Sequence, residues 1–269
     1  KVPAEVKIIE IIALFKDELR RNKIEAKEAT LCLSGKDLIV RIFEMPMMPR
    51  EELQSAINFE VKKYIPFKAE DLIFDFQVKA DKANHSNLVL YIGIKKETLD
   101  KYVSILSQLN LKISAIEHSA FSILRCVGLA GLNDKGVVGL IGLDTEGQDE
   151  VNFSVLENGF PLFSRGISLT DGPKETGKPE EAIPGEILEK LKTEVRVSLD
   201  YYHRKFPQKA IKKIFIISNQ DQYSTLEAFL SELSFSAQFV DVTKFIAKPV
   251  SYSLGLIKSF SASLSKTIK

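Results

Sequence analysis

Two corners containing proline lie close together in this sequence: Glu44-Met45-Pro46-Met47-Met48-Pro49-Arg50-Glu51-Glu52-Leu53 and Lys62-Lys63-Tyr64-Ile65-Pro66-Phe67. Because proline disrupts a helix interior but is accepted in its first turn, we expect a helix to begin near Pro49 and to end before Pro66. Between the corners, apolar residues recur at spacings of three and four and form one stripe: Leu53, Ala56, Ile57, Val61 and Tyr64. The pattern predicts a short amphipathic helix of the kind found in docking modules, without a catalytic residue set.

Glu60 lies within this apolar stripe, where a carboxylate costs free energy unless it is hydrogen-bonded. It could be an acid with a perturbed pKa. We favour a structural role, in which Glu60 bonds neighbouring backbone N–H groups and so holds the corner at Pro66.

Composition sets broad limits on function. The 269 residues, of which 45% are hydrophobic and 27% charged, are typical of a globular protein with one large or two modest domains. With 37 Lys and Arg against 36 Asp and Glu, the net charge of +1 argues against a nucleic-acid platform. No uncharged apolar run of about 18 residues occurs, so we expect no direct membrane span. Cys32 and Cys126 are expected to be reduced and buried.

Periodicity predicts a mixed α/β order along the chain. Helices are expected at 6–22, 51–64, 97–109, 119–132, 186–205 and 223–233, and strands at 29–34, 37–44, 72–79, 88–95, 112–117, 137–143, 150–156, 160–169, 211–218 and 237–242. Asn158-Gly159 predicts a tight hairpin, so Gly159 is given a structural role. The Gly- and Pro-rich stretch 171–185 is expected to be a mobile loop, and 252–265 is weakly amphipathic.

Several segments resemble, in the same order, the PilM family of type IV pilus assembly proteins, which are cytoplasmic and actin-like. The proline corners are one match, and the others are Asp75-Phe76-Gln77-Val78, Glu117 to Arg125, Asn158-Gly159 with Phe163-Ser164-Arg165, Glu194 to Tyr202 and Tyr252 to Leu256. No single match decides the question, but together they are specific and span nearly the whole chain.

The resemblance implies an α/β, actin-like (FtsA/PilM-like) two-domain fold with an inserted small α/β subdomain. Residues 1–36 and 113–135 would form the first actin-like domain, 37–112 the inserted subdomain, and 136–269 the second domain, whose tail could pack back on the first. The chain opens at Lys1 rather than Met, so we expect it to be a fragment that lacks an N-terminal segment with the first phosphate loop.

In this fold, two loops hold nucleotide phosphates and a Gly-rich turn closes the adenine pocket. The second loop would follow the strand 137–143, where the residues that could contribute are Gly142, Asp144, Thr145 and Gly147. The family's Asp and Gly are exchanged here, three acids crowd the phosphate position, and the stretch 218–222 lacks glycine for the adenine turn. Like charges disfavour a triphosphate. We therefore predict a degenerate site and expect no cofactor, while ATP with Mg²⁺ stays open for a full-length protein.

No other constellation of residues indicates chemistry. His85, His118 and His203 lie in separate elements, without the spacing of metal ligands, so no metal site is predicted. The sequence also lacks a Ser/His/Asp, Cys/His or P-loop arrangement. No catalytic residue is predicted.

The resemblance implies a scaffold at the cytoplasmic face of the inner membrane, in a type IV pilus or type II secretion-like assembly. In the family, the partner is a PilN-like bitopic membrane protein whose N-terminal peptide lies in a groove between the first domain and the inserted subdomain, and other pilus assembly proteins are further partners. We expect the groove wall to contain Ile39, Arg41, Phe43, Leu53 and Ile57. Two alternatives stay open: a working actin-like ATPase or sugar-kinase-like enzyme, and a filament-forming actin-like protein of another machine.

Overall fold

The structure is a computed structural model of the chain, and it describes residues 4–33, 37–63, 65, 67–81, 85–129, 136–144, 150–169, 185–218, 220–241, 259 and 262. The chain divides into two compact units, Lys1–His118 and Ser119–Lys269. The finer division into two actin-like domains and an inserted subdomain remains a prediction. No helix in the described ranges is long and apolar enough to cross a membrane.

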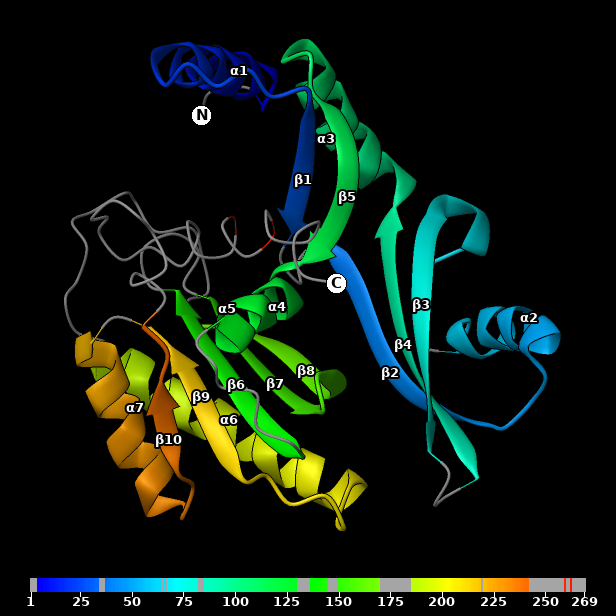
Figure 1. The fold of residues 1–269 in the computed structure, drawn as a ribbon, viewed down its shortest axis with the longest axis vertical. Coiled ribbons are helices and arrows are strands. Elements are labelled where there is room, and N and C mark those ends of the chain that lie inside the picture. Colours follow the sequence, from blue (N-terminus) through cyan, green and yellow to red (C-terminus); the bar gives the residue numbers. More distant parts are fainter. Residues whose placement is uncertain are drawn as a thin grey trace. The chain divides into compact units, whose positions relative to one another are not determined.

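The first unit contains a parallel pair of strands (Figure 1). The pair consists of β1 (Glu28–Leu33) and β5 (Lys112–His118), which meet although a long stretch of chain lies between them. Helix α3 (Lys96–Gln108) contacts β5 and also helix α1 (Ala4–Arg21). The two strands therefore join segments that precede and follow everything from β2 to α3.

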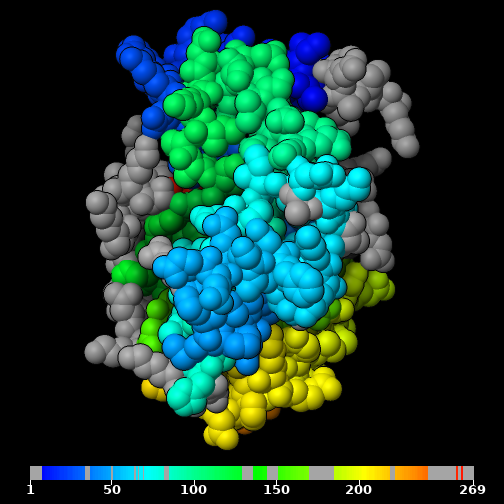
Figure 2. Space-filling model, turned by 90° about the vertical axis from the view of Figure 1, so that its right-hand side faces the viewer, coloured from blue at the N-terminus to red at the C-terminus, as the bar shows by residue number. Residues whose placement is uncertain are grey.

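The rest of the first unit is an antiparallel sheet in the order β2-β4-β3, formed by Leu38–Pro46, Ser86–Lys95 and Leu72–Asp81. Helix α2 (Arg50–Val61) packs on one face, and a short 3₁₀ helix, η1 (Ala69–Asp71), precedes β3. The core between α2 and the sheet consists of Phe43, Met45, Leu53, Ile57, Val61, Ile65, Leu72, Val89 and Tyr91. Figure 2 shows the outer surface of this part of the unit.

The opposite face of the same sheet shares a core with the parallel pair. Buried Leu33, Leu38 and Ile94 are its centre, and the residues packed around them are Leu31, Val40, Ile92, Leu99, Tyr102 and Ile116. These residues come from β1, β2, β4, α3 and β5. Strands β2 and β4 contribute to both cores because alternate residues of a strand point to opposite faces. One continuous apolar cluster thus joins the two sheets of the first unit.

The predicted amphipathic helix is confirmed, with its start at the proline. Pro49 stands at the N-cap position of α2 with extended backbone angles (φ −55°, ψ 147°). The helix ends at Val61, a few residues earlier than expected, and the Ile65 N–H still donates to the Val61 carbonyl at 3.1 Å. Tyr64 and Pro66 lie outside the described residues.

The second unit contains a five-stranded sheet in the order β10-β9-β6-β7-β8, with β6 (Val137–Asp144) at its centre. Its other strands are β7 (Glu150–Glu157), β8 (Phe160–Ser168), β9 (Lys213–Ile217) and β10 (Ala237–Phe239). Strands β6, β9 and β10 are parallel, while β6, β7 and β8 are antiparallel. The predicted hairpin between β7 and β8 is confirmed, because Asn158 (φ 51°) and Gly159 (φ 81°) both adopt the left-handed conformation that a two-residue turn requires.

Helices cover both faces of this sheet. On one face, Ile123 between the short helices α4 (Ser119–Ser122) and α5 (Leu124–Leu129) enters the core with Cys126 and Val127 of α5. On the other face, α6 (Gly185–Lys205) packs on β7 and β8. Helix α7 (Gln220–Glu232) contacts β10. The single helix predicted over 119–132 is therefore two short ones, and α7 begins three residues before the predicted start at Tyr223. Most of 252–265 lies outside the described residues.

Candidate functional site

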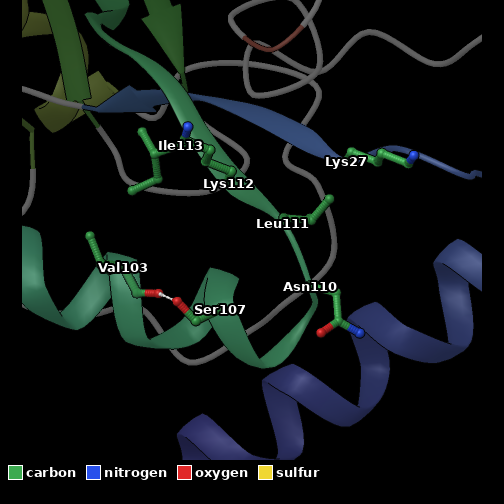
Figure 3. Close-up of a pocket in the computed structure, with 7 residues that line it drawn as sticks. All are labelled: Lys27, Val103, Ser107, Asn110, Leu111, Lys112 and Ile113. Carbon is green, nitrogen blue, oxygen red and sulfur yellow. Dashed lines mark hydrogen bonds between the residues drawn. The ribbon is translucent and has the colours of Figure 1, made fainter.

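A cavity of about 530 Å³ opens in the first unit between α3, the beginning of β5 and the residue that precedes β1 (Figure 3). The residues that line it are Lys27, Val103, Ser107, Asn110, Leu111, Lys112 and Ile113. The sequence predicts the border between the first actin-like domain and the inserted subdomain at residues 36/37 and 112/113. The cavity therefore lies where the two predicted pieces join.

The cavity exists because α3 ends in a tight reversal. Asn110 has φ 57°, the Leu111 N–H donates to the Leu106 carbonyl at 2.9 Å, and the Asn110 N–H donates to the Ser107 carbonyl at 3.0 Å. This is the Schellman pattern, which satisfies the last carbonyls of a helix and turns the chain away from its axis. The chain then enters β5, and the Lys112 N–H donates to the Lys27 carbonyl at 2.9 Å. The helix and the strand consequently form two adjoining walls.

The walls combine apolar side chains with a polar rim. Val103 is 42% exposed, and Figure 3 shows it pointing toward Ile113 of β5. Ser107 donates its hydroxyl to the Val103 carbonyl at 2.7 Å, so the oxygen lone pairs stay available on the rim. Lys27 and Lys112 are exposed and bring positive charge. Such a surface suits an extended peptide with an aliphatic side chain and backbone groups that bond the rim.

Three residues that the sequence places in the groove wall lie in the core instead. Phe43 and Leu53 are each 7% exposed and Ile57 is completely buried, all between α2 and the β2-β4-β3 sheet. A buried side chain offers no surface to a peptide, so these residues are assigned to packing. Ile39 packs partly buried against the same cluster. Arg41 is exposed and its guanidinium donates to the Val40 carbonyl at 2.8 Å, so its role in binding stays a prediction.

Glu60 closes the end of α2. Its carboxylate accepts a hydrogen bond from Lys63 Nζ at 2.7 Å, and its carbonyl accepts one from the Lys63 N–H at 3.0 Å. Lys63 also lies over the ring of Phe59, at 5.8 Å from its centre. An ion pair across the last turn therefore holds the Glu60 side chain. Its predicted bonds to backbone N–H groups at the corner stay a prediction, because Pro66 lies outside the described residues.

Tyr102 fixes α3 to the beginning of β2. Its hydroxyl donates to Asp37 Oδ2 at 3.0 Å. Burial, and then the neighbouring Asp37 carboxylate, raise the pKa of Tyr102 to about 12. The phenol therefore stays protonated across the physiological range and keeps this bond beside the cavity.

Two of the predicted nucleotide residues, Gly142 and Asp144, lie at the end of β6. Gly142 pairs with Asn152 on one side and Ile217 on the other, and Asp144 is the register partner of Glu150. Thr145 and Gly147 fall outside the described residues. Asn152 is 3% exposed, and its carboxamide has no hydrogen-bond partner among the residues that the structure describes. The degenerate nucleotide site therefore stays a prediction.

Two sequence motifs, Phe163-Ser164-Arg165 and Glu194 to Tyr202, lie far apart in the chain but meet in the second unit. Arg165 of β8 forms an ion pair with Glu194 of α6 at 2.6 Å and donates to Ser198 Oγ at 3.4 Å. The rings of Phe163 and Tyr201 lie 5.6 Å apart, centre to centre. The two motifs therefore fasten α6 to the edge of the sheet, a structural role that the sequence alone did not assign.

Within the described ranges, no group of His, Cys, Asp and Glu could hold a metal ion.

Comparison with solved structures defines the fold. A chain of a PilM-PilN type IV pilus biogenesis complex is similar in fold, with 17% identity, a TM-score of 0.69, and coverage of 95% of this chain and 82% of that one. The cytoplasmic domain of EpsL, an inner membrane component of the type II secretion system of Vibrio cholerae, gives 11% identity and a TM-score of 0.52 over 93% and 79% of the two chains. The fold is therefore the mixed α/β fold of PilM and EpsL, as the sequence predicted.

A sequence comparison then identifies the family. The family of the type IV pilus assembly protein PilM matches residues 4–172, which is more than half of the chain. The chain belongs to this family. MreB 5 of Spiroplasma citri bound to AMPPNP is also similar, at 11% identity and a TM-score of 0.41 over 65% of this chain and 66% of that one, which is too low to argue for nucleotide binding.

Proposed function

We propose that this protein is a cytoplasmic scaffold of a type IV pilus, or type II secretion-like, inner-membrane assembly. It binds the cytoplasmic N-terminal peptide of a PilN-like bitopic membrane protein, and this partner holds it at the membrane. Membership of the PilM family supports the assembly role, and the similarity to a chain of a PilM-PilN complex supports the choice of partner. Other pilus assembly proteins would be further partners.

The observation that carries the proposal is the cavity between α3 and β5. The cavity lies at the predicted border between the first domain and the inserted subdomain, and the apolar side chain of Val103 is exposed there. An aliphatic residue of the peptide would pack between Val103 and Ile113. Backbone groups of the peptide would bond the Asn110 carboxamide and the Ser107 hydroxyl, and this division of affinity and specificity is common in peptide grooves.

The test is peptide binding measured by fluorescence anisotropy. The probe is a fluorescein-labelled synthetic peptide with the N-terminal cytoplasmic residues of the PilN-like protein encoded in the same genome. Val103→Asp should weaken binding roughly tenfold or more, because burial of one aliphatic contact contributes about 1.5 kcal/mol. Val197→Asp is the matched control, since Val197 is 48% exposed on α6. Equal affinities of the two variants would place the peptide elsewhere, and no binding by the unaltered protein would contradict the proposed function.

We also propose that the nucleotide site is degenerate and that the protein is not an enzyme. The acidic residues around the turn after β6 and the lack of glycine in 218–222 support this. Isothermal titration calorimetry of the full-length protein with Mg·ATP tests it. Weak or no heat of binding is expected, and a dissociation constant in the micromolar range or below would overturn this part of the proposal.

A further inference from the structure

Strand β3 has a long open edge that the proposed function does not use. It spans ten residues, and within the described part of the chain β4 is its partner in the sheet. The strand is rich in residues that favour sheets, and two of its apolar side chains are exposed, Ile73 at 46% and Val78 at 36%. Figure 2 shows the face of the first unit that contains β3, coloured cyan. An open edge of this kind is a template for another strand.

The direction of one backbone amide shows which residues of β3 face outward. The Phe76 N–H donates to the Oδ1 atom of its own neighbour, Asp75, at 2.8 Å. An amide engaged in this way points away from the ladder with β4. Because N–H groups alternate between the two sides of a strand, Phe74 and Val78 also present their N–H groups to the open edge. Asp75 therefore occupies the central hydrogen-bond donor of this edge.

The open edge of β3 is complementary to itself. If a second copy pairs antiparallel about Phe76, the two Phe76 residues exchange both backbone bonds. Phe74 then lies opposite Val78 of the second copy, an aromatic and β-branched pair of the favourable kind. Asp75 lies opposite Gln77, and the two Asp75 carboxylates become diagonal neighbours, about 7–8 Å apart. The carboxylate thus opposes this pairing both by its charge and by its bond to Phe76.

We propose that the open edge of β3 is an acceptor surface for the same strand of a second copy of this chain, and that Asp75 prevents this pairing. The residue belongs to the Asp75-Phe76-Gln77-Val78 motif, whose acid has no role in the core or in the cavity. Charged side chains on edge strands are a known means of preventing association between sheets. This inference is independent of the peptide groove.

The experiment compares self-association of the unaltered chain with that of Asp75→Ala, by light scattering after size-exclusion chromatography over a concentration series. Asp75→Ala should tighten dimer formation about tenfold or more, because it frees one amide and removes two like charges from the pair. Hydrogen exchange of the Phe74, Phe76 and Val78 amides should slow in the same samples. Asp100→Ala is the charge-matched control, since Asp100 is exposed on α3.

A second substitution keeps the test decisive. Asp75→Ala combined with Val78→Pro should restore the behaviour of the unaltered chain, because proline removes an outward N–H without breaking the ladder with β4. Circular dichroism and thermal melting confirm that each variant is folded. Unchanged mass and exchange in Asp75→Ala would overturn the proposal. Association that persists after Val78→Pro, or that Asp100→Ala reproduces, would also overturn it.

Discussion

Substitution of Ile57 by alanine separates the two roles considered for the helix between the proline corners. Ile57 is completely buried among Phe43, Leu53, Val89 and Tyr91, so we assign it to the core of the first unit. Had it been part of a peptide groove, Ile57→Ala would weaken peptide binding and leave stability almost unchanged. In the structure described here, the change should instead lower the free energy of unfolding.

The magnitude follows from burial. Alanine has three fewer carbon atoms than isoleucine, and each buried CH₂ contributes roughly 0.8 kcal/mol, which gives about 2.4 kcal/mol before any cavity is counted. A rigid core adds a cavity term, so we expect a total of about 3–4 kcal/mol. With a urea dependence near 2 kcal/mol per molar, the midpoint for the first unit should fall by roughly 1.5–2 M.

The assay is urea unfolding, monitored through the hydrogen exchange of peptides from β2 and β4. A local readout is needed because the chain has two units, and one global probe would mix their unfolding transitions. The matched control is Phe59→Ala on the same helix, where the side chain is 68% exposed and a change below about 0.5 kcal/mol is expected. If Ile57→Ala left the midpoint unchanged, or if Phe59→Ala cost as much, the assignment of this helix face to the core would be refuted.

Three further changes test other parts of the structure. Tyr202→Phe should lower the free energy of unfolding of the second unit by about 1–2 kcal/mol, because the buried hydroxyl donates to a backbone carbonyl at 2.7 Å, whereas Tyr201→Phe at a half-exposed position should not; urea denaturation measures both. Gly159→Ala should cost about 1 kcal/mol in thermal unfolding, from strain at φ 81° alone, since a Cβ there would meet no atom within 4 Å; a larger loss would indicate an unrecognised contact. The pKa values of Tyr102 and Tyr223 are raised to about 12, first by burial and then by hydrogen-bonded carboxylates, so their stabilising effect is complete below pH 10 and is lost as pH rises from 10 to 12. Tyr102→Phe should therefore reduce the fall in unfolding midpoint over that interval, and an identical fall in the variant would count against this linkage.

The sequence predicted most of the elements because their signals are local. The proline at position 49 marks the start of α2, and Asn158-Gly159 specifies its hairpin through backbone conformation alone. The helix predicted over 119–132 shows where local signals are insufficient. It is interrupted at Ile123, whose side chain is 1% exposed in the core of the second unit, and tertiary packing of that kind has no local signature.

The cavity could not be located from the sequence for a related reason. The sequence predicts a helix over 97–109, and its apolar residues Leu99, Tyr102, Val103 and Leu106 follow helical spacing. Leu99 and Tyr102 do pack in the core, yet Val103 is left open. Whether an apolar residue is covered depends on which distant segment lies opposite, and here that segment is the start of β5. For the same reason, the family resemblance could not show that Phe43, Leu53 and Ile57 are buried by their partners between α2 and the sheet.

The apolar cluster around Leu33, Leu38 and Ile94 has a consequence for recognition. It joins β1 and β5 to β2, β4 and α3, so the two walls of the cavity are anchored in one packed interior. A well-packed interior deforms little, so we expect the two walls to keep their spacing when a peptide binds. A cavity that keeps its shape is preorganised, and a peptide that binds it would lose its own freedom at little further cost to the protein. Differences in affinity among peptides should then come mainly from their dissociation rates.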